Sequence, residues 1–169
     1  RIDIRGANGV SLREQWREGP STYLGMLVHG YPNLLMPSGP QSGSASTNYP
    51  RGIENGVNWC TDFLEYLWER GIGRAEATED AQEAWTDHVK QMYTVMLMRK
   101  AKSWFTGYNS NVEGHEEGTI RYLVYNGGTP KYVSRINEVA AGGYSGIELG
   151  APRLLPPEDE AYEHGHAAG

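Results

Sequence analysis

Cysteine is almost absent from this sequence, since Cys60 is the only one among 169 residues. One cysteine cannot form a disulfide within the chain, so the sequence favours a reducing compartment and we expect a cytoplasmic protein. The sequence also contains no apolar run long enough to span a bilayer and no leader with a cleavage site. We therefore expect no membrane association.

Basic residues are scarce relative to acidic ones. Lysine and arginine total 15 against 21 aspartates and glutamates, and the formal net charge is -6. This balance disfavours binding to the phosphate backbone, so we expect no nucleic-acid partner. The hydrophobic content of 38% and the aromatic content of 11% are typical of a globular chain with a sizeable core.

Motifs that would carry chemistry on their own are also missing. The chain has neither Gly-x-Gly-x-x-Gly nor a phosphate-binding Gly-Lys-Ser/Thr triplet. It has no Cys-x-x-Cys or His-Glu-x-x-His, and its five histidines are scattered, so we expect no metal. No serine lies in a Gly-x-Ser-x-Gly elbow, and Cys60 falls in an apolar helical pattern that predicts burial. We therefore assign no catalytic residue.

Apolar spacing predicts an α/β chain of mixed helices and short strands. A first helix is expected through Ile53 to Leu67, ending at Gly71 and Gly73. A second should run from a Thr78 cap to about Met98. A third should run from a Thr129 cap to Gly142-Gly143. Short strands are expected at Arg1–Arg5, Asn33–Met36, Ile120–Tyr125 and Gly146–Leu149. The first of these places the start of the chain in a strand, which indicates processing or a fragment of a longer protein.

Two segments are candidates for ligand binding. The Gly/Ser-rich loop from Ser38 to Asn48 lies between a predicted strand and a predicted helix, an order that can deliver a ligand to a helix N-terminus. The same residues are equally consistent with an ordinary connecting loop that binds no ligand. Trp104 lies in a loop rich in glycine and asparagine, where its indole could cover a ligand or anchor the loop in the core. Both interpretations of Trp104 remain open at this point.

Several segments in one order resemble the C-terminal part of type I Baeyer-Villiger monooxygenases. They are Ile2–Gly6, Pro20–Gly25, Pro32–Leu34, Ser38–Pro40, Asn48 with Ile53-Glu54, Lys100–Asn109, Tyr125–Gly128, and Tyr132 onward to Gly146. The resemblance implies an FAD- and NADPH-dependent enzyme that inserts one oxygen atom from O2 beside a ketone carbonyl, giving an ester or lactone. It further implies that residues 1–150 are the C-terminal half of a discontinuous, Rossmann-like FAD-binding domain, and we expect 151–169 to be a disordered tail with acids and prolines.

The resemblance also implies roles by position. Residues near the flavin would be Gly39, Pro40, Ser42, Asn48 and Tyr49. Residues facing the ketone would be Ser44, Ala45, Ser46 and Tyr49, and Trp104 would bind the ribose of NADP. The chain departs from the family pattern where Gly43 replaces a common proline, at Tyr49, and in the stretch from Asn109 to His115.

The resemblance implies that this chain is incomplete without an N-terminal nucleotide-binding half. We expect the 169 residues alone to be inactive, because the phosphate-binding turns are absent from them. The alternative function is a non-enzymatic remnant that binds a protein partner through exposed apolar surface.

Overall fold

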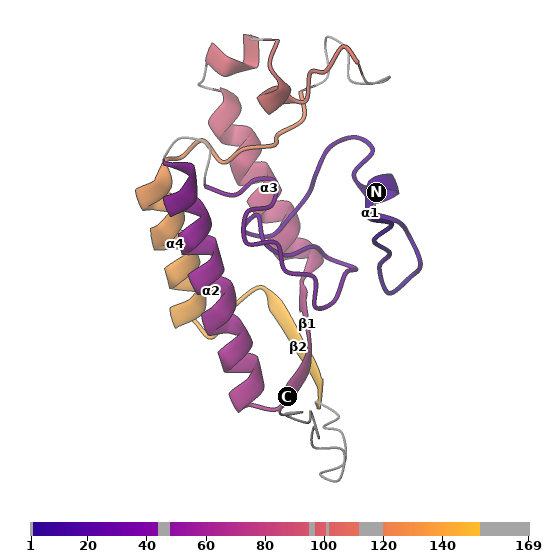
Figure 1. Cartoon of the computed structure of the whole chain (residues 1–169), viewed down its shortest axis with the longest axis vertical. Coiled ribbons are helices and arrows are strands. Elements are labelled where there is room, and N and C mark those ends of the chain that lie inside the picture. The colour runs from indigo at the N-terminus through magenta and orange to yellow at the C-terminus, as the bar shows by residue number, and fades with distance from the viewer. Residues whose placement is uncertain (1, 44–47, 95–96, 101, 112–119, 153–169) are drawn as a thin grey trace, which may run out of the picture.

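A computed structural model describes residues 2–43, 48–94, 97–100, 102–111 and 120–152 of the chain. The elements in chain order are α1 (Leu12–Gln15), α2 (Tyr49–Glu69), β1 (Ile72–Ala77), α3 (Glu79–Thr94), η1 (Leu97–Lys100), η2 (Trp104–Thr106), α4 (Thr129–Ala141) and β2 (Ile147–Pro152). Helices α2 and α4 lie side by side, and the β1–β2 ribbon lies beside the C-terminal end of α2 (Figure 1). The expected mixture of helices and short strands is confirmed.

Helix α2 confirms the first predicted helix. Its N-cap is Asn48, whose side chain accepts a hydrogen bond from the Arg51 amide at 3.3 Å, and Pro50 lies in the first turn, where no amide hydrogen is needed. The helix ends before Gly71, whose φ of 64° suits a glycine. Five residues of its inner face are buried: Gly56, Trp59, Cys60, Phe63 and Leu67.

The other two predicted helices form with different ends. The Thr78 hydroxyl accepts a hydrogen bond from the Ala81 amide at 3.2 Å, as expected for the cap of α3, but α3 stops at Thr94 and a 3-10 turn follows. Helix α4 is capped by Gly128 and not by Thr129, whose hydroxyl is buried without a hydrogen-bond partner among the described residues. The C-terminal prediction is correct, because Gly143 has a left-handed φ of 72°.

Three of the four predicted strands are wrong. The described part of Arg1–Arg5 forms only one bridge, between Arg5 and Ser11, and Ile2 is 90% exposed, because no described strand lies beside this segment. Residues 33–36 form no strand: Asn33 lies in a turn with a φ of 61°, and residues 34–36 are irregular. Residues 120–125 run without a sheet ladder and bond instead to loops and to a tyrosine hydroxyl.

The fourth predicted strand is confirmed as β2, which pairs antiparallel with β1 in the register Ala75 to Leu149 and Ala77 to Ile147. Sequence reasoning missed β1 because its residues, Ile-Gly-Arg-Ala-Glu-Ala, include only one β-branched side chain. Tertiary contacts hold β1 in place. The buried Glu76 carboxylate accepts hydrogen bonds from the Gly30 amide at 2.8 Å and from the Arg74 guanidinium at 2.5 Å. β2 also includes residues 151–152, while the remainder of the predicted tail lies outside the described residues.

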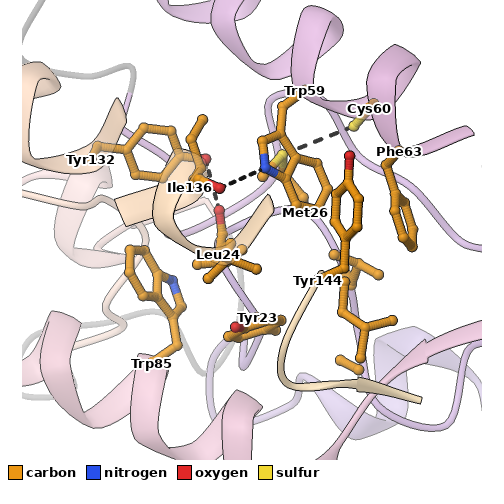
Figure 2. Close-up of a cluster of buried hydrophobic side chains, with 14 of the residues drawn as sticks. Tyr23, Leu24, Met26, Trp59, Cys60, Phe63, Trp85, Tyr132, Ile136 and Tyr144 are labelled. Carbon is orange, nitrogen blue, oxygen red and sulfur yellow. Dashed lines mark hydrogen bonds between the residues drawn. The ribbon is translucent and has the colours of Figure 1, made fainter. Parts of the chain in front are cut away.

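A core rich in aromatic side chains joins the helices to the segment 23–27 (Figure 2). The Trp59 indole donates to the Ile136 carbonyl at 2.8 Å, and the Tyr132 hydroxyl donates to the Leu24 carbonyl at 2.7 Å, so both buried polar groups are satisfied. Cys60 is 5% exposed and contacts Met26, which confirms its predicted burial. None of the described helices combines the length and apolar composition that a membrane span requires.

Candidate functional site

The loop from Ser38 to Gly43 is built around a buried glutamine that sequence reasoning missed. Gln41 is fully buried with a φ of 65°, and its amide donates to the Leu123 carbonyl at 2.8 Å. Its side-chain oxygen accepts from the Thr22 amide at 3.1 Å and from the Thr22 hydroxyl at 2.8 Å. Its side-chain nitrogen donates to the Pro20 carbonyl at 2.9 Å. These bonds fix the course of the loop, and no local sequence signal distinguishes this glutamine from a surface one.

Two glycines of the loop are required by the packing of the chain itself. A Cβ atom at Gly39 would meet the Gly25 carbonyl oxygen at 2.5 Å, and one at Gly43 would meet the Tyr132 ring at 2.4 Å. The loop therefore packs directly on the segment near residue 25 and on α4.

The structure places the predicted site residues in two groups. Ser42 is buried, and Gly39 and Pro40 are partly buried within the fixed loop. Asn48 and Tyr49 are exposed at the start of α2, with Tyr49 54% exposed. The predicted ketone-facing residues Ser44, Ala45 and Ser46 lie outside the described residues.

Trp104 is presented on the surface by a short capped turn, η2. The Ser103 hydroxyl accepts from the Phe105 amide at 3.2 Å, the Thr106 hydroxyl donates to the Ser103 carbonyl at 2.7 Å, and Gly107 closes the turn with a φ of 84°. The Trp104 side chain is 75% exposed. The interpretation of Trp104 as a core anchor is therefore wrong, and its indole faces out of the chain.

The turn that carries Trp104 is tied to α3 by Tyr93. The Tyr93 hydroxyl donates to the Phe105 carbonyl at 3.4 Å and accepts from the Val124 amide at 3.2 Å. Burial is the main cause that raises the pKa of this phenol, so the hydroxyl keeps its proton and its role as a donor at neutral pH. Sequence reasoning missed Tyr93, because its spacing on α3 predicts an ordinary core residue.

The segment 120–125 connects the loop and the turn. Its Leu123 carbonyl accepts from the Gln41 amide, and its Arg121 amide donates to the Thr106 carbonyl at 2.8 Å. The Tyr125 amide also donates to the Ser42 carbonyl at 3.3 Å. One irregular segment thus holds both candidate sites to the same framework, although more than 60 residues separate Ser42 from Trp104 in the sequence.

The described histidines are in separate surroundings. His29 lies beside Glu76 and the Ala77 carbonyl, whereas His88 lies against Trp85, and burial followed by the Arg135 charge lowers the pKa of His88. Over the residues that the structure describes, no three His, Cys, Asp or Glu side chains gather closely enough to hold a metal ion.

Comparison with known proteins finds relatives of this chain. No protein-family model matches the chain. The chain is 35% identical over 149 residues to cyclohexanone 1,2-monooxygenase from Acinetobacter sp., a match that covers 88% of the chain and 26% of that protein. It is 33% identical over 147 residues to a Baeyer-Villiger monooxygenase from Pseudooceanicola batsensis, covering 87% and 26%. The chain is thus homologous to one part of the Baeyer-Villiger monooxygenases.

The fold agrees with this family. The crystal structure of OTEMO in complex with FAD and NADP superposes with a TM-score of 0.78 at 34% identity, covering 88% of this chain and 26% of that one. The chain therefore spans about a quarter of the length of the Baeyer-Villiger monooxygenases it matches. The resemblance expected from the sequence motifs is confirmed, and the helices with their two-stranded sheet correspond to one portion of a flavin monooxygenase.

Proposed function

We propose that residues 1–150 supply the C-terminal part of a discontinuous FAD-binding domain in a flavin- and NADPH-dependent Baeyer-Villiger monooxygenase. The complete enzyme would insert one oxygen atom from O2 beside a ketone carbonyl, yielding an ester or lactone. The observation that carries the proposal is the similarity along 88% of the chain to cyclohexanone 1,2-monooxygenase and to the solved structure of OTEMO in complex with FAD and NADP. The rigidly held loop from Ser38 to Gly43 supports it.

The loop has features that suit a flavin neighbour. Gln41 fixes its backbone from inside, so Gly39, Pro40 and Ser42 are presented without further ordering cost. The Ser38 hydroxyl is buried and has no hydrogen-bond partner among the described residues. Asn48 and Tyr49 start α2, whose N-terminal end carries partial positive charge. Bound FAD would supply the oxygen-transfer chemistry at this loop.

The remaining assigned roles concern the nicotinamide cofactor and the ketone. Trp104 would donate its indole N–H to the ribose of NADP. Its side chain is 75% exposed and so can reach a bound cofactor. Ser44, Ala45 and Ser46, together with the exposed Tyr49, would face the ketone. The side chains at these positions would select the shape of the ketone and not carry out the chemistry.

The test begins with the DNA that flanks the coding sequence of this chain. An open reading frame upstream should encode the nucleotide-binding half, and the extended protein should retain flavin and oxidise NADPH when cyclohexanone is added as a probe ketone. In that protein, Trp104→Ala should raise the KM for NADPH by about tenfold or more, because the substitution removes an aromatic contact and its hydrogen bond. Leu97→Ala is the control, because Leu97 is 83% exposed and has no assigned role.

Two results would contradict the proposal: no upstream frame, or an extended protein that contains no flavin. Either would favour the alternative of a non-enzymatic protein-interaction module. The observation behind that alternative is the row of exposed apolar side chains on α2.

A further inference from the structure

A cleft lies between α3 and α4, and the proposed function gives no role to any residue that lines it. Its volume of about 700 Å³ is within the range of small-molecule sites. Helix α3 contributes Ala81, Ala84, Trp85 and His88, and residues at this spacing share one face of a helix. Because each alanine offers only a methyl group, this face of α3 leaves room for a ligand.

Aromatic rings form the floor of the cleft. The Trp85 and Tyr125 rings are nearly fully buried and stack with their centroids 5.2 Å apart. Trp85 also lies 6.1 Å from the Tyr132 ring of α4 (Figure 2). A further wall is the turn before β2, which Tyr23 holds by donating its hydroxyl to the Ser145 carbonyl at 2.7 Å. The folded chain therefore forms the cleft by itself, and a ligand would not have to order it.

The rim that α4 contributes to the cleft is basic. Lys131 and Arg135 are exposed, line the cleft and lie about one helical turn apart. Among the described residues no acid pairs with Lys131, while Glu138 lies 3.6 Å from Arg135. Burial first and then the Arg135 charge lower the pKa of His88, so this charge acts across the cleft on α3. Of the lysine, arginine and carboxylate side chains described along the cleft, two are basic and one is acidic, whereas acids outnumber bases in the whole chain.

We propose that the cleft binds a small organic anion, whose apolar body lies over the two alanines and the aromatic floor and whose carboxylate pairs with Lys131 and Arg135. Ligand sites combine mostly apolar walls with a few placed charges, as this cleft does. A guanidinium and an ammonium on one side suit a carboxylate, and the apolar wall opposite them favours an organic body over a bare inorganic ion. Neither FAD nor NADPH is needed for this binding, so the chain itself can be tested.

The isotopically labelled chain is titrated with cinnamate, and the amide shifts measured by nuclear magnetic resonance give both the Kd and the place of binding. Signals of residues 81–88 and 131–138 should move. Lys131→Gln and, separately, Arg135→Gln should raise the Kd by about fivefold or more, because each removes a charge-assisted hydrogen bond. Lys90→Gln is the matched control. Lys90 is on α3 but does not line the cleft, so the Kd should change by less than about twofold.

Two further variants should change the Kd in opposite directions. Glu138→Gln removes the carboxylate that competes for Arg135 and should lower the Kd by about two- to fivefold. Ala84→Leu fills the space over the floor and should raise the Kd by about tenfold or more. Ala84, Lys131 and Glu138 are exposed, so the thermal midpoint of each variant should stay close to that of the native chain.

Two other probes separate the charge of the ligand from its body. Cinnamyl alcohol has the same body without the charge, so equally tight binding of the alcohol would overturn the role of the basic rim. Inorganic phosphate has charge without the body, and phosphate binding as tight as that of cinnamate would identify a site for bare anions and overturn the proposal. With cinnamate itself, shifts confined to residues outside the cleft, no saturation, or a Lys131→Gln chain that behaves as Lys90→Gln does would each contradict it.

Discussion

Gly25 and Gly30 have similar left-handed backbones but different surroundings. Their φ angles are 72° and 85°, yet a Cβ atom at Gly25 would meet the Ser42 amide nitrogen at 2.4 Å, whereas one at Gly30 would meet nothing within 4 Å. Gly30→Ala should cost only the left-handed conformation, about 1–2 kcal/mol. Gly25→Ala should cost about 1–3 kcal/mol more, because the loop at Ser42 must shift. Urea unfolding of both variants measures the difference, and equal costs would contradict the contact.

Gln41 is the residue on which the loop depends. Gln41→Ala leaves the buried Thr22 amide without an acceptor, and we expect the free energy of unfolding to fall by about 1–3 kcal/mol. Gln15→Ala is the control, since Gln15 is exposed and makes one 3.3 Å bond, so its loss should cost under about 0.5 kcal/mol. Denaturant titration distinguishes the two, and a neutral Gln41→Ala would show that the loop is held by other contacts.

Cys60 should be unreactive in the folded chain. Burial raises its pKa to about 11, so at pH 8 roughly one thiol in a thousand is ionised. In the unfolded chain the thiol has a pKa of about 8.5, so at pH 8 roughly one thiol in four is ionised. Iodoacetamide labelling followed by mass spectrometry should be more than about a hundredfold slower for the folded chain than in urea. Equal labelling rates would contradict the burial of Cys60. Because the Cys60 thiol has a higher pKa in the folded than in the unfolded chain, the free energy of unfolding should fall as the pH rises from about 8.5 towards about 11.

At the scale of elements, β1 pairs on one side with β2 and, among the described residues, is bonded through its backbone on the other side by Asn33. The Asn33 amide donates to the Ala75 carbonyl at 2.8 Å, the Asn33 side-chain oxygen accepts from the Ala75 amide at 2.9 Å, and its nitrogen donates to the Gly73 carbonyl at 3.0 Å. One asparagine in a left-handed conformation thus substitutes for an edge strand. The apolar run after Asn33 therefore forms no strand, although its composition predicts one.

Asn33→Ala should therefore destabilise the sheet. The Ala75 amide would lose its acceptor, and we expect a loss of about 1–3 kcal/mol in the free energy of unfolding. Asn33→Asp keeps the acceptor and should cost less, and Asn58→Ala on the exposed side of α2 should cost little. Hydrogen exchange at the Ala75 amide is the direct measurement, and protection that survives Asn33→Ala would contradict the role.

The helices were predictable and most strands were not, for a physical reason. A helix satisfies its backbone within a continuous segment, so the apolar spacing from Ile53 to Leu67 suffices to locate α2, and the Thr78 cap with the apolar spacing after it suffices to locate the start of α3. A strand needs a partner chosen by the fold. Residues 120–125 alternate as a strand does, but their neighbours are the Gln41 loop and Tyr93, and no ladder forms.

At the scale of the whole molecule, we expect the chain alone not to bind FAD. Its 169 residues contain no phosphate-binding turn followed by a helix, so nothing would hold the pyrophosphate. Dialysis of the purified chain against FAD should leave a colourless protein with no NADPH oxidation. A yellow, stoichiometric flavoprotein would contradict both this expectation and the need for a nucleotide-binding half.

The sequence by itself determined the family, the helices and the identity of the candidate loop and tryptophan, because colinear motifs and helical periodicity are local properties that survive in one dimension. Only the tertiary structure decided how these candidates are held and which way they face. Trp104 faces outward because Tyr93 and the segment 120–125 fix the turn beneath it. The loop from Ser38 to Gly43 is rigid because Gln41 bonds to segments distant in sequence. Such contacts arise only when separate elements pack together, so no local pattern encodes them.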